Sequence, residues 1–417
     1  MDRVRVLWIG HFAPYPPKGG AMQRSFNMLK EMAGFADIDL VTLMPRSKVR
    51  AYYPDFQTGQ KEISESLSKY VRKFVTISHG LNARKLNKYF LGFKSLFSQV
   101  PYDVLALRSS KFEQAVQEAL ESNEYDVVYI DTIGLAAYVG NVNSPKIVNH
   151  HNIESQMLER RANNSSGILK LYFKWQSSRT RSWEKYWCNR VEVNLVCSEL
   201  DRQRLRTYVN CEIEVIPNGV DIEYFKRSKD YSDSEVTGCI FAGGLEWYPN
   251  AKAVDFIVNE LEPVYDLSIT KGPVVICGKG WHKGLADVSK RANKIFAAGF
   301  VDDIRMPMEK AAIYVCPIDD GGGTKLKVLD ALAMGIPLIA HPIACEGINV
   351  KEGDTVVFAR TANEYVKEIE ALMRSPTKRE LMSRAGIRLI EENYSYSTIG
   401  KKIKSVIDSV TAEWSKN

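Results

Sequence analysis

The sequence predicts an α/β protein made of two doubly wound domains that face each other across a cleft. Apolar runs of strand length alternate with segments of helical spacing along most of the chain. The alternation is interrupted by the turn residues Pro217–Asp221 and the polar stretch 226–235, which indicates a domain boundary. Three glycines, Gly321–Gly323, follow an apolar run and open a helical segment. Since ligands of such folds bind at the carboxyl ends of strands, we expect the binding site in the cleft.

The first domain is predicted to span residues 1–220. Its alternating pattern favours a parallel sheet covered by helices. The expected strands are Val4–Ile9, Asp37–Met44, Tyr70–Ile77, Tyr125–Ile130, Lys146–Asn149, Val191–Cys197 and Glu212–Ile216. The expected helices are Ala21–Met32, Lys111–Ser122 and one long stretch over Ile153–Arg190.

The second domain is predicted to span residues 221–395 and repeats the same alternation. Residues 396–417 are expected to form a terminal helix that packs back on the first domain. The expected strands are Cys239–Phe241, Val274–Cys277, Ile295–Phe300, Ala311–Pro317 and Pro337–Ala340. The expected helices include Ala251–Leu261 and the terminal helices within Lys378–Ile407.

Composition places the chain among ordinary globular proteins. Its 417 residues are 45% hydrophobic and 25% charged, with a net charge of +6, which leaves room for two substantial cores. The seven cysteines form no CxxC pair, so we expect reduced thiols. Neither a signal peptide nor an apolar run long enough to span a bilayer is evident in the sequence. We expect a cytoplasmic protein, either soluble or peripheral on the cytoplasmic face of the membrane.

The glycine turn carries the most informative chemistry. Glycines let the backbone approach a ligand closely, and the N–H groups at a helix start attract anions. Thr324 stands where a helix N-cap is expected, Lys325 and Lys327 add positive charge, and Asp330 can accept hydrogen bonds from two vicinal hydroxyls. The pattern therefore predicts a site for a phosphate and a sugar. Two alternatives stay open: a plain turn, and a solvated helix face on which Lys327 pairs with Asp330.

A set of short motifs occurs in order along nearly the whole chain, each weak alone and strong together. They are Gly19-Gly20, His150–Glu154, Val196–Asp201, Ile216–Asp221, Phe241–Leu245, Gly299–Asp303 and Gly321–Asp330. By these motifs the chain resembles the GT-B glycosyltransferases of family 4, retaining enzymes that use nucleotide sugars. Its glycine turn is similar to a subgroup with a GGGT(K/R)LK pattern.

The resemblance implies an enzyme of class EC 2.4 that moves a hexosyl or related sugar from a nucleotide-diphosphate sugar. The acceptor is expected to be a saccharide or a lipid-linked saccharide, in cell-surface polysaccharide or glycolipid biosynthesis. Catalytic roles are assigned to His151, which follows a strand end, and to Lys325. The expected donor-binding residues are Gly19, Gly20, Gly244, Gly278, Val301, Gly322, Gly323, Thr324, Lys325, Lys327 and Asp330.

The chain departs from the family pattern in two places. Where the family carries two glutamates, this sequence has Gly322 and Asp330. Where the family has an arginine after the first strand of the second domain, Gly244 stands here, and no lysine falls at the family's lysine position. Lys325 and Lys327 are the candidates to replace that positive charge. The departure also suggests alternatives: a non-catalytic nucleotide-sugar-binding protein, or a sugar-nucleotide epimerase of GT-B architecture.

No metal or other cofactor is expected. The six histidines are scattered through the sequence, and no convincing carboxylate pair stands at DxD spacing after a strand. The diphosphate leaving group is therefore expected to be stabilised by backbone N–H groups and lysines, without a metal.

Positive charge is concentrated between Leu67 and Tyr102, a stretch that contains no aspartate or glutamate. Basic residues interleaved with aromatic ones from Lys69 to Lys94 are typical of peripheral contact with an anionic membrane. A solvated helix with an apolar inner face is the alternative. A second basic and aromatic cluster, 170–190, is expected to be a packed helix. Nucleic acid is not expected as a partner, since no nucleic-acid fold signature occurs.

Overall fold

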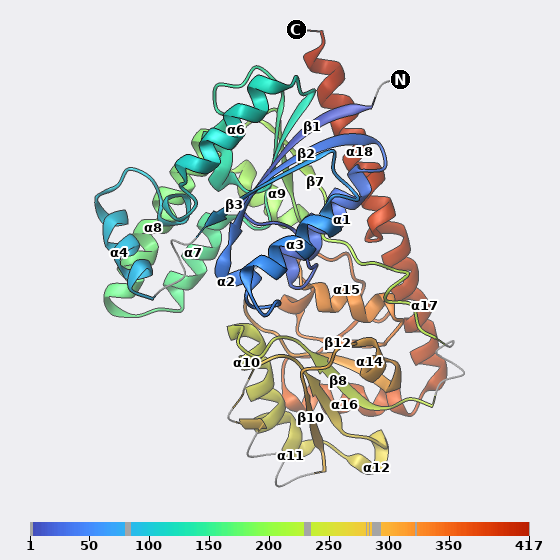
Figure 1. Cartoon of the computed structure of the whole chain (residues 1–417). Coiled ribbons are helices and arrows are strands. Elements are labelled where there is room, and N and C mark those ends of the chain that lie inside the picture. The colour runs from blue at the N-terminus through green and yellow to red at the C-terminus, as the bar shows by residue number, and fades with distance from the viewer. Residues whose placement is uncertain are drawn as a thin grey trace. The chain divides into compact units, whose positions relative to one another are not determined.

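The protein divides into two compact units in the computed structural model, which describes residues 3–79, 85–228, 235–280, 282, 284–285, 293–321 and 323–416. Side chains of residues 85–88 are outside that description. Unit 1 comprises residues 1–217 and 399–417, and unit 2 comprises residues 218–398 (Figure 1). The first domain was predicted to end at 220 and the terminal helix to begin at 396, within three residues of these divisions.

Unit 1 is built on a seven-stranded sheet in the order β3-β2-β1-β4-β5-β6-β7. All of its strand pairings are parallel. The sequence order reverses between β1 and β4, so the switch point of the sheet lies between these two strands. The strands are β1 (Val4–Gly10), β2 (Ala36–Pro45), β3 (Lys73–His79), β4 (Val127–Ile130), β5 (Lys146–Asn149), β6 (Val193–Val196) and β7 (Glu212–Val215).

The central strands of unit 1 are apolar and buried on both faces, as parallel sheets covered by helices require. Their near-continuous apolar runs explain why the sequence predicted them. The helices are α1 (Gly20–Met32), α2 (Arg46–Val49), α3 (Phe56–Leu67), α4 (Lys85–Phe97), α5 (Tyr102–Ala106), α6 (Ser110–Ser122), η1 (Ile133–Val139), α7 (Glu154–Asn163), α8 (Gly167–Cys188) and α9 (Glu199–Arg206).

The single long helix predicted over Ile153–Arg190 is wrong in one respect, because the structure has two helices there, α7 and α8. The break falls at a run of turn-forming residues, 164–166, and Gly167 has a φ of 57°. A positive φ is readily adopted by glycine and rarely by residues with a side chain. The chain therefore turns at this point instead of continuing the helix.

Unit 2 is built on a six-stranded sheet in the order β10-β9-β8-β11-β12-β13, again with parallel pairings. Its switch point lies between β8 and β11. The strands are β8 (Thr237–Ala242), β9 (Val274–Cys277), β10 (Ile295–Gly299), β11 (Ala311–Cys316), β12 (Leu338–Ala340) and β13 (Val357–Phe358). The helices are α10 (Tyr248–Phe256), η3 (Ile257–Leu261), α11 (Glu262–Val264), α12 (Leu267–Thr270), α14 (Arg305–Lys310), α15 (Leu326–Ala333), η4 (Pro342–Cys345), α16 (Ala362–Met373) and α17 (Pro376–Asn393).

The last helix, α18 (Tyr396–Trp414), belongs to unit 1 from Ile399 onward. Ile399, Ile403 and Ile407 recur every fourth residue and are each at most 1% exposed. This spacing forms an apolar stripe on one helix face. The structure thus confirms two doubly wound parallel sheets. In its described part, no helix is long and apolar enough to cross a membrane.

Candidate active site

The loops that follow β8 and β9 in unit 2 approach each other so closely that only glycine fits. A Cβ atom on Gly278 would lie 1.8 Å from the carbonyl oxygen of Gly243. The Gly243 N–H donates to the Cys277 carbonyl at 2.9 Å, and the Gly278 N–H donates to Gly299 at 2.8 Å. These contacts place the turn Gly243-Gly244 beside the switch point between β8 and β11, where open α/β sheets bind ligands.

Lys327, from the first turn of α15 after β11, reaches the same turn. Its ammonium group donates to Asn250 Oδ1 and lies 4.8 Å from the centre of the Phe241 ring. A Cβ on Gly243 would be 2.4 Å from Lys327 Nζ. Asn250 Nδ2 donates to the Gly244 carbonyl at 2.8 Å, so one amide side chain fixes both the lysine and the turn. The structure thus brings Lys327 and Gly244 together.

Burial lowers the pKa of Lys327 to about 8, and the nearby positive charge of Lys325 adds to this effect. Most Lys327 side chains are therefore still protonated at pH 7. Asp330 lies on the same helix, and burial raises its pKa to about 8, while Lys327 opposes the rise. Within the described residues, Asp330 Oδ1 is buried without a hydrogen-bond partner. A buried carboxyl oxygen without a partner can accept a hydrogen bond from a hydroxyl group of a ligand.

The prediction that Thr324 caps the helix is wrong. The helix begins at Leu326, with Lys325 in the N-cap position and an extended ψ of 99°. Thr324 Oγ1 is buried and has no hydrogen-bond partner in the part of the chain that the structure describes. The N–H groups of the first helical turn therefore belong to Leu326 and Lys327, three residues later than the predicted Gly323 and Thr324. Serine and threonine favour the N-cap, but the turn residues decide where helical backbone can begin.

Lys325 closes the glycine turn on itself. Its ammonium group donates to the carbonyls of Gly321 and Gly323, each at 2.9 Å. Gly321 and Gly323 have φ values of 96° and 72°, which explains why glycine is needed at both positions. Gly322, the remaining predicted residue of this turn, lies outside the described residues.

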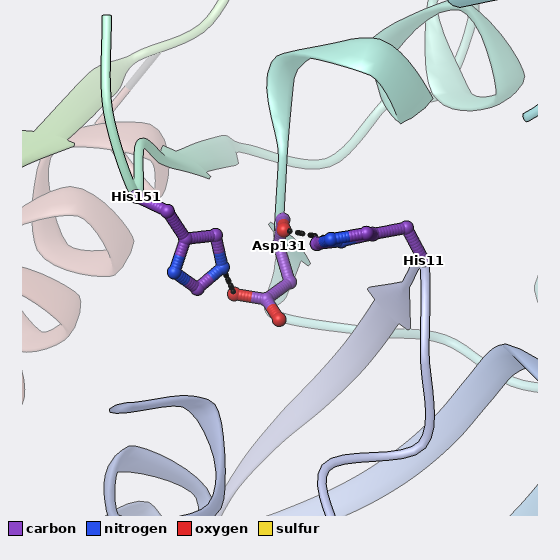
Figure 2. Close-up of side chains that lie close together, drawn as sticks. All are labelled: His11, Asp131 and His151. Carbon is purple, nitrogen blue, oxygen red and sulfur yellow. Dashed lines mark hydrogen bonds and ion pairs between the residues drawn. The ribbon is translucent and has the colours of Figure 1, made fainter. Parts of the chain in front are cut away.

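A second polar cluster lies at the switch point of the unit 1 sheet. His11 follows β1, Asp131 follows β4, and His151 lies two residues after β5. His151 Nε2 is 3.2 Å from Asp131 Oδ1, and His11 Nδ1 is 3.2 Å from the Asp131 backbone oxygen (Figure 2). One ligating atom from each residue falls within 4.8 Å of the other two. Histidines that are scattered in the sequence are therefore brought together by the sheet.

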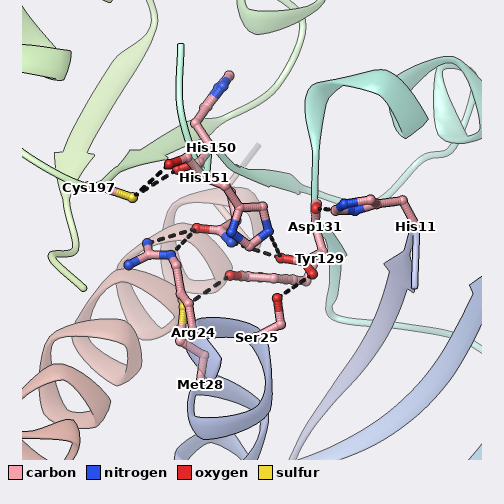
Figure 3. Close-up of polar contacts among 10 residues, drawn as sticks. His11, Arg24, Ser25, Met28, Tyr129, Asp131, His150, His151 and Cys197 are labelled. Atoms are coloured by element: carbon pink, nitrogen blue, oxygen red, sulfur yellow. Dashed lines mark hydrogen bonds and ion pairs between the residues drawn. The ribbon is translucent and has the colours of Figure 1, made fainter. Parts of the chain in front are cut away.

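Hydrogen bonds from buried neighbouring side chains fix the position of Asp131 in this cluster. Ser25 Oγ donates to Asp131 Oδ2 at 2.7 Å, and Asn149 Nδ2 donates to Asp131 Oδ1 at 2.8 Å. Arg24, which is 1% exposed, donates in turn to Asn149 Oδ1 at 2.9 Å. His150 contacts other groups, with its Nε2 at 3.2 Å from Asn194 Oδ1. Its backbone oxygen accepts from Cys197 Sγ at 3.2 Å (Figure 3). The two adjacent histidines thus have different surroundings.

Burial and the neighbouring His151 lower the pKa of His11 to about 3. Burial alone would raise the pKa of Asp131, but His151 and His11 outweigh it, so the net shift is downward. At neutral pH the cluster therefore combines a neutral imidazole with an ionised carboxylate.

Comparison with known families assigns both halves of the chain. Residues 97–224 match the family described as Glycosyltransferase Family 4, and residues 237–375 match the one described as Glycosyl transferases group 1. The chain belongs to the GT-B glycosyltransferases. Its two parallel sheets, with the two families matched in this order, are the architecture of that group.

Solved structures agree with this GT-B fold. Sucrose-phosphate synthase from Thermosynechococcus elongatus has a TM-score of 0.69 and 14% sequence identity, covering 99% of this chain and 100% of its own. HepE from Anabaena, in complex with UDP, has a TM-score of 0.65 and 13% identity, covering 97% of this chain and 100% of its own. A curated relative from Klebsiella pneumoniae, "Uncharacterized 44.6 kDa protein in cps region", is 21% identical, covering 97% of this chain and 99% of its own.

The other predicted donor residues of this GT-B glycosyltransferase lie at strand or helix ends. In unit 1, Gly19 precedes α1, which begins at Gly20, and has a φ of 95° with nothing within 4 Å of a Cβ position. In unit 2, Gly278 follows β9 directly, and Val301 follows β10 and is partly buried against the core. Gly278 has a packing reason to be glycine, whereas Gly244 does not, because a Cβ there would meet only the Lys279 oxygen at 4.0 Å.

Sequence reasoning missed Asn250, His11 and Asp131. Asn250 has no motif around it, and its role depends on a contact with a residue 77 positions away. His11 and Asp131 did have a signal, since each is the first polar side chain after a buried strand. The rule that pointed to the glycine turn, applied to every strand, would have found them.

Proposed function

We propose that the chain transfers a sugar, with retention of configuration, from a nucleotide-diphosphate sugar to a saccharide or lipid-linked saccharide. The observation that carries the proposal is the position of Lys327. A protonated amine is held by Asn250 against the glycine turn at the switch point of unit 2. A fixed cation beside a glycine turn is suited to a diphosphate, whose charge grows as the sugar leaves.

The other residues of the turn have roles that follow from their contacts. Lys325 holds the glycine turn in shape through two carbonyls and adds charge to it. Asp330, whose Oδ1 has no partner within the described residues, is assigned to the ribose hydroxyls. Outside the turn, in unit 1, His151 keeps its predicted role at a hydroxyl of the donor sugar. Since two lysines supply the positive charge at the turn, we propose that nucleotide binding needs no metal.

Solved structures of relatives and a curated relative give further support. Solved structures of HepE contain UDP, UDP with glucose, and UDP-glucose. A structure of S. aureus TarM, with a TM-score of 0.62, also contains UDP. The Klebsiella relative is placed in a region called cps, which supports a role in polysaccharide biosynthesis.

Isothermal titration of the full chain with UDP and other nucleoside diphosphates tests the donor site. Lys327→Met should weaken binding at least tenfold, because it removes a charge-assisted hydrogen-bond donor worth roughly 1.5–3 kcal/mol. Lys252→Met is the matched control, since Lys252 is another lysine of unit 2 and pairs with Asp319 at 2.6 Å. Equal affinity with EDTA and with Mg²⁺ is expected. Wild-type affinity in Lys327→Met would refute the assignment.

The missing family arginine at Gly244 favours one alternative, a nucleotide-sugar-binding protein without turnover. Incubation with a bound nucleotide sugar and candidate acceptors separates the two functions. Transfer or slow hydrolysis of the donor supports the enzyme, whereas tight binding without product supports the binding protein. A new sugar isomer formed from donor alone would instead indicate an epimerase.

We also propose peripheral contact with an anionic membrane, on a surface of unit 1 that keeps the α4 part of the predicted stretch Lys69–Lys94 and adds the start of α8. Arg72 pairs with Asp39, and Lys73 begins β3, so these basic residues belong to the sheet. The exposed apolar side chains lie instead on α4 and at the start of α8, which lie side by side in Figure 1. They are Tyr89, Phe90, Phe93, Leu96, Phe97, Ile168, Leu169 and Leu171.

Hydrogen bonds between α4 and α8 hold the two helices of this apolar surface together. Ser95 Oγ of α4 accepts from Gln176 Nε2 of α8 at 2.8 Å and lies 3.2 Å from the Tyr172 hydroxyl. The cluster 170–190 had been expected to form a packed helix, but its Leu171 is 68% exposed. Large exposed apolar patches mark interaction surfaces, and Lys94 and Lys170 add positive charge to this one.

Flotation with liposomes tests the membrane proposal. Binding to vesicles that contain anionic phospholipid is expected at low salt, and weaker binding to zwitterionic vesicles. The double variant Phe93→Ser, Phe97→Ser should abolish it, whereas Phe296→Ser, which changes an exposed aromatic of unit 2, should not. No flotation of the wild type at low salt would refute the proposal.

A further inference from the structure

The carboxyl ends of β1 and β2 in unit 1 belong to two segments that are rich in basic residues and lack acidic ones. Residues 10–30 and 40–54 contain no aspartate or glutamate, and their lysines and arginines are Lys18, Arg24, Lys30, Arg46, Lys48 and Arg50. The two strands are parallel neighbours in the sheet, so the loops that follow them lie at the same edge. Positive charge that is gathered in this way attracts anions.

A hollow lies between these two segments and has mostly aromatic and apolar walls. Its lining includes Phe12, Tyr15, Met22, Lys48, Tyr52 and Tyr53. The Tyr52 hydroxyl donates to the Lys18 carbonyl at 3.3 Å, which ties the loop after β1 to the segment after α2. We call this region, with Lys18 and Lys48, the basic hollow of unit 1.

The two lysines of the basic hollow are held by aromatic rings and not by carboxylates. Lys48 Nζ lies 4.5 Å from the centre of the Phe12 ring, and Lys18 Nζ lies 5.8 Å from the centre of the Tyr52 ring. Neither lysine forms an ion pair with another residue that the structure describes. A contact with a ring face orients an ammonium group and leaves its N–H groups for a further partner.

The basic hollow adjoins the unit 1 part of the candidate active site. Phe12, under Lys48, directly follows His11, and the centres of the two rings lie 4.2 Å apart. Burial lowers the pKa of His11 to about 3, and the positive charge of Lys48 contributes to this shift. An anion bound at Lys48 would therefore lie near the residues that follow β1 at the switch point.

We infer that the basic hollow binds a negatively charged group of the acceptor, a carboxylate or a phosphate carried by a saccharide. The inference rests on the proposed function and names the acceptor class of that reaction. Because the donor diphosphate is assigned to Lys327 in unit 2, the lysines of unit 1 are left for the second substrate. Ammonium groups bind both kinds of anion through charge-assisted hydrogen bonds, and the aromatic walls offer apolar surface to a sugar ring.

Titration of the full chain with defined saccharides, without donor, tests the inference. The probes are tetragalacturonate, which carries carboxylates, glucose 1-phosphate, which carries a phosphate, and the neutral maltotetraose. At low salt, at least one charged probe should bind about tenfold more tightly than maltotetraose, and its affinity should fall as salt is added. The charged probe that binds more tightly shows which anion the acceptor carries.

Two double variants locate the binding. Lys18→Met with Lys48→Met should weaken binding of the charged probe roughly tenfold, because both ammonium groups of the basic hollow are lost. Lys30→Met with Lys61→Met is the matched control, since it removes the same charge from unit 1 at lysines that do not line the hollow. UDP affinity should be unchanged in both double variants, and melting curves show that each is folded.

The inference is overturned if no charged probe binds more tightly than maltotetraose, or if the two double variants bind the charged probe equally well. It is also overturned if Lys18→Met with Lys48→Met loses UDP affinity, because the two lysines would then serve the donor. Binding of a charged probe by a wild-type chain that binds no UDP would instead refute the donor site of unit 2 and support the basic hollow.

Discussion

Replacement of Gly278 by alanine tests the close approach that forms the donor turn. The new Cβ would lie 1.8 Å from the Gly243 carbonyl oxygen, whereas ordinary contact begins at 3.4 Å. The obstacle is backbone on both sides, so the ends of β8 and β9 must separate by about 1.6 Å. Overpacking of this kind costs about 1–3 kcal/mol.

Separation of the strand ends would also break or lengthen two backbone hydrogen bonds. They are Gly278 to Gly299 at 2.8 Å and Gly243 to Cys277 at 2.9 Å, each worth about 0.5–1.5 kcal/mol. We therefore expect Gly278→Ala to destabilise unit 2 by about 2–6 kcal/mol, a large share of the usual stability of a domain.

Urea unfolding of the full chain, followed by circular dichroism, measures this loss. Gly244→Ala is the matched control in the same turn, because its Cβ would contact only the Lys279 oxygen at 4.0 Å and should change stability by less than about 0.5 kcal/mol. UDP binding should fall in the first variant and persist in the second. If the two variants unfold at the same urea concentration, the reasoning about the turn is wrong.

Three further predictions concern the same site. Gly244→Arg, which places the family's guanidinium where space allows, should tighten UDP binding roughly tenfold in titration calorimetry, and no gain would show that the diphosphate lies elsewhere. Asp330 has a pKa of about 8, so the native state keeps a proton that the unfolded chain releases above about pH 4, and stability falls as pH rises from about 4 to 8. Asp330→Asn should remove this loss of stability, which we expect to reach roughly 1–3 kcal/mol at pH 8 in urea unfolding. An unchanged dependence of stability on pH would contradict the prediction. Lys325→Met should lower the rate of transfer more than it lowers UDP affinity, because the turn loses its two carbonyl bonds and part of its charge; a change in affinity alone would count against a role in the reaction.

The fold could be predicted because its central strands are buried on both faces, and their continuous apolar runs are visible in a single sequence. Helices on the surface were harder, since their apolar residues are diluted among polar ones. Helix α16 was not predicted, although Thr361 and Glu364 have the spacing of a capping box in the sequence. The helix α3 likewise begins after Asp55, whose side chain accepts from the Thr58 N–H at 2.8 Å.

The candidate site was predictable to the extent that it is local. The glycine turn and its two lysines adjoin each other in the chain, so their chemistry could be interpreted together. The error at Thr324 arose because the turn continues one residue beyond the point where propensity alone would start the helix. Asn250 and the pairing of Asp131 with His11 depend on the order of strands in a sheet, which residue type does not reveal.

The late position of α18 has a consequence for biosynthesis. Unit 2 is one continuous segment, whereas unit 1 needs residues from both ends of the chain. As the chain leaves the ribosome, residues 1–217 must wait with an apolar face uncovered until Ile399, Ile403 and Ile407 have been made. Unit 2 can complete its fold during that interval. The unit synthesised first is therefore finished last, and a nascent chain that stalls before residue 399 would carry a folded unit 2 and an incomplete unit 1.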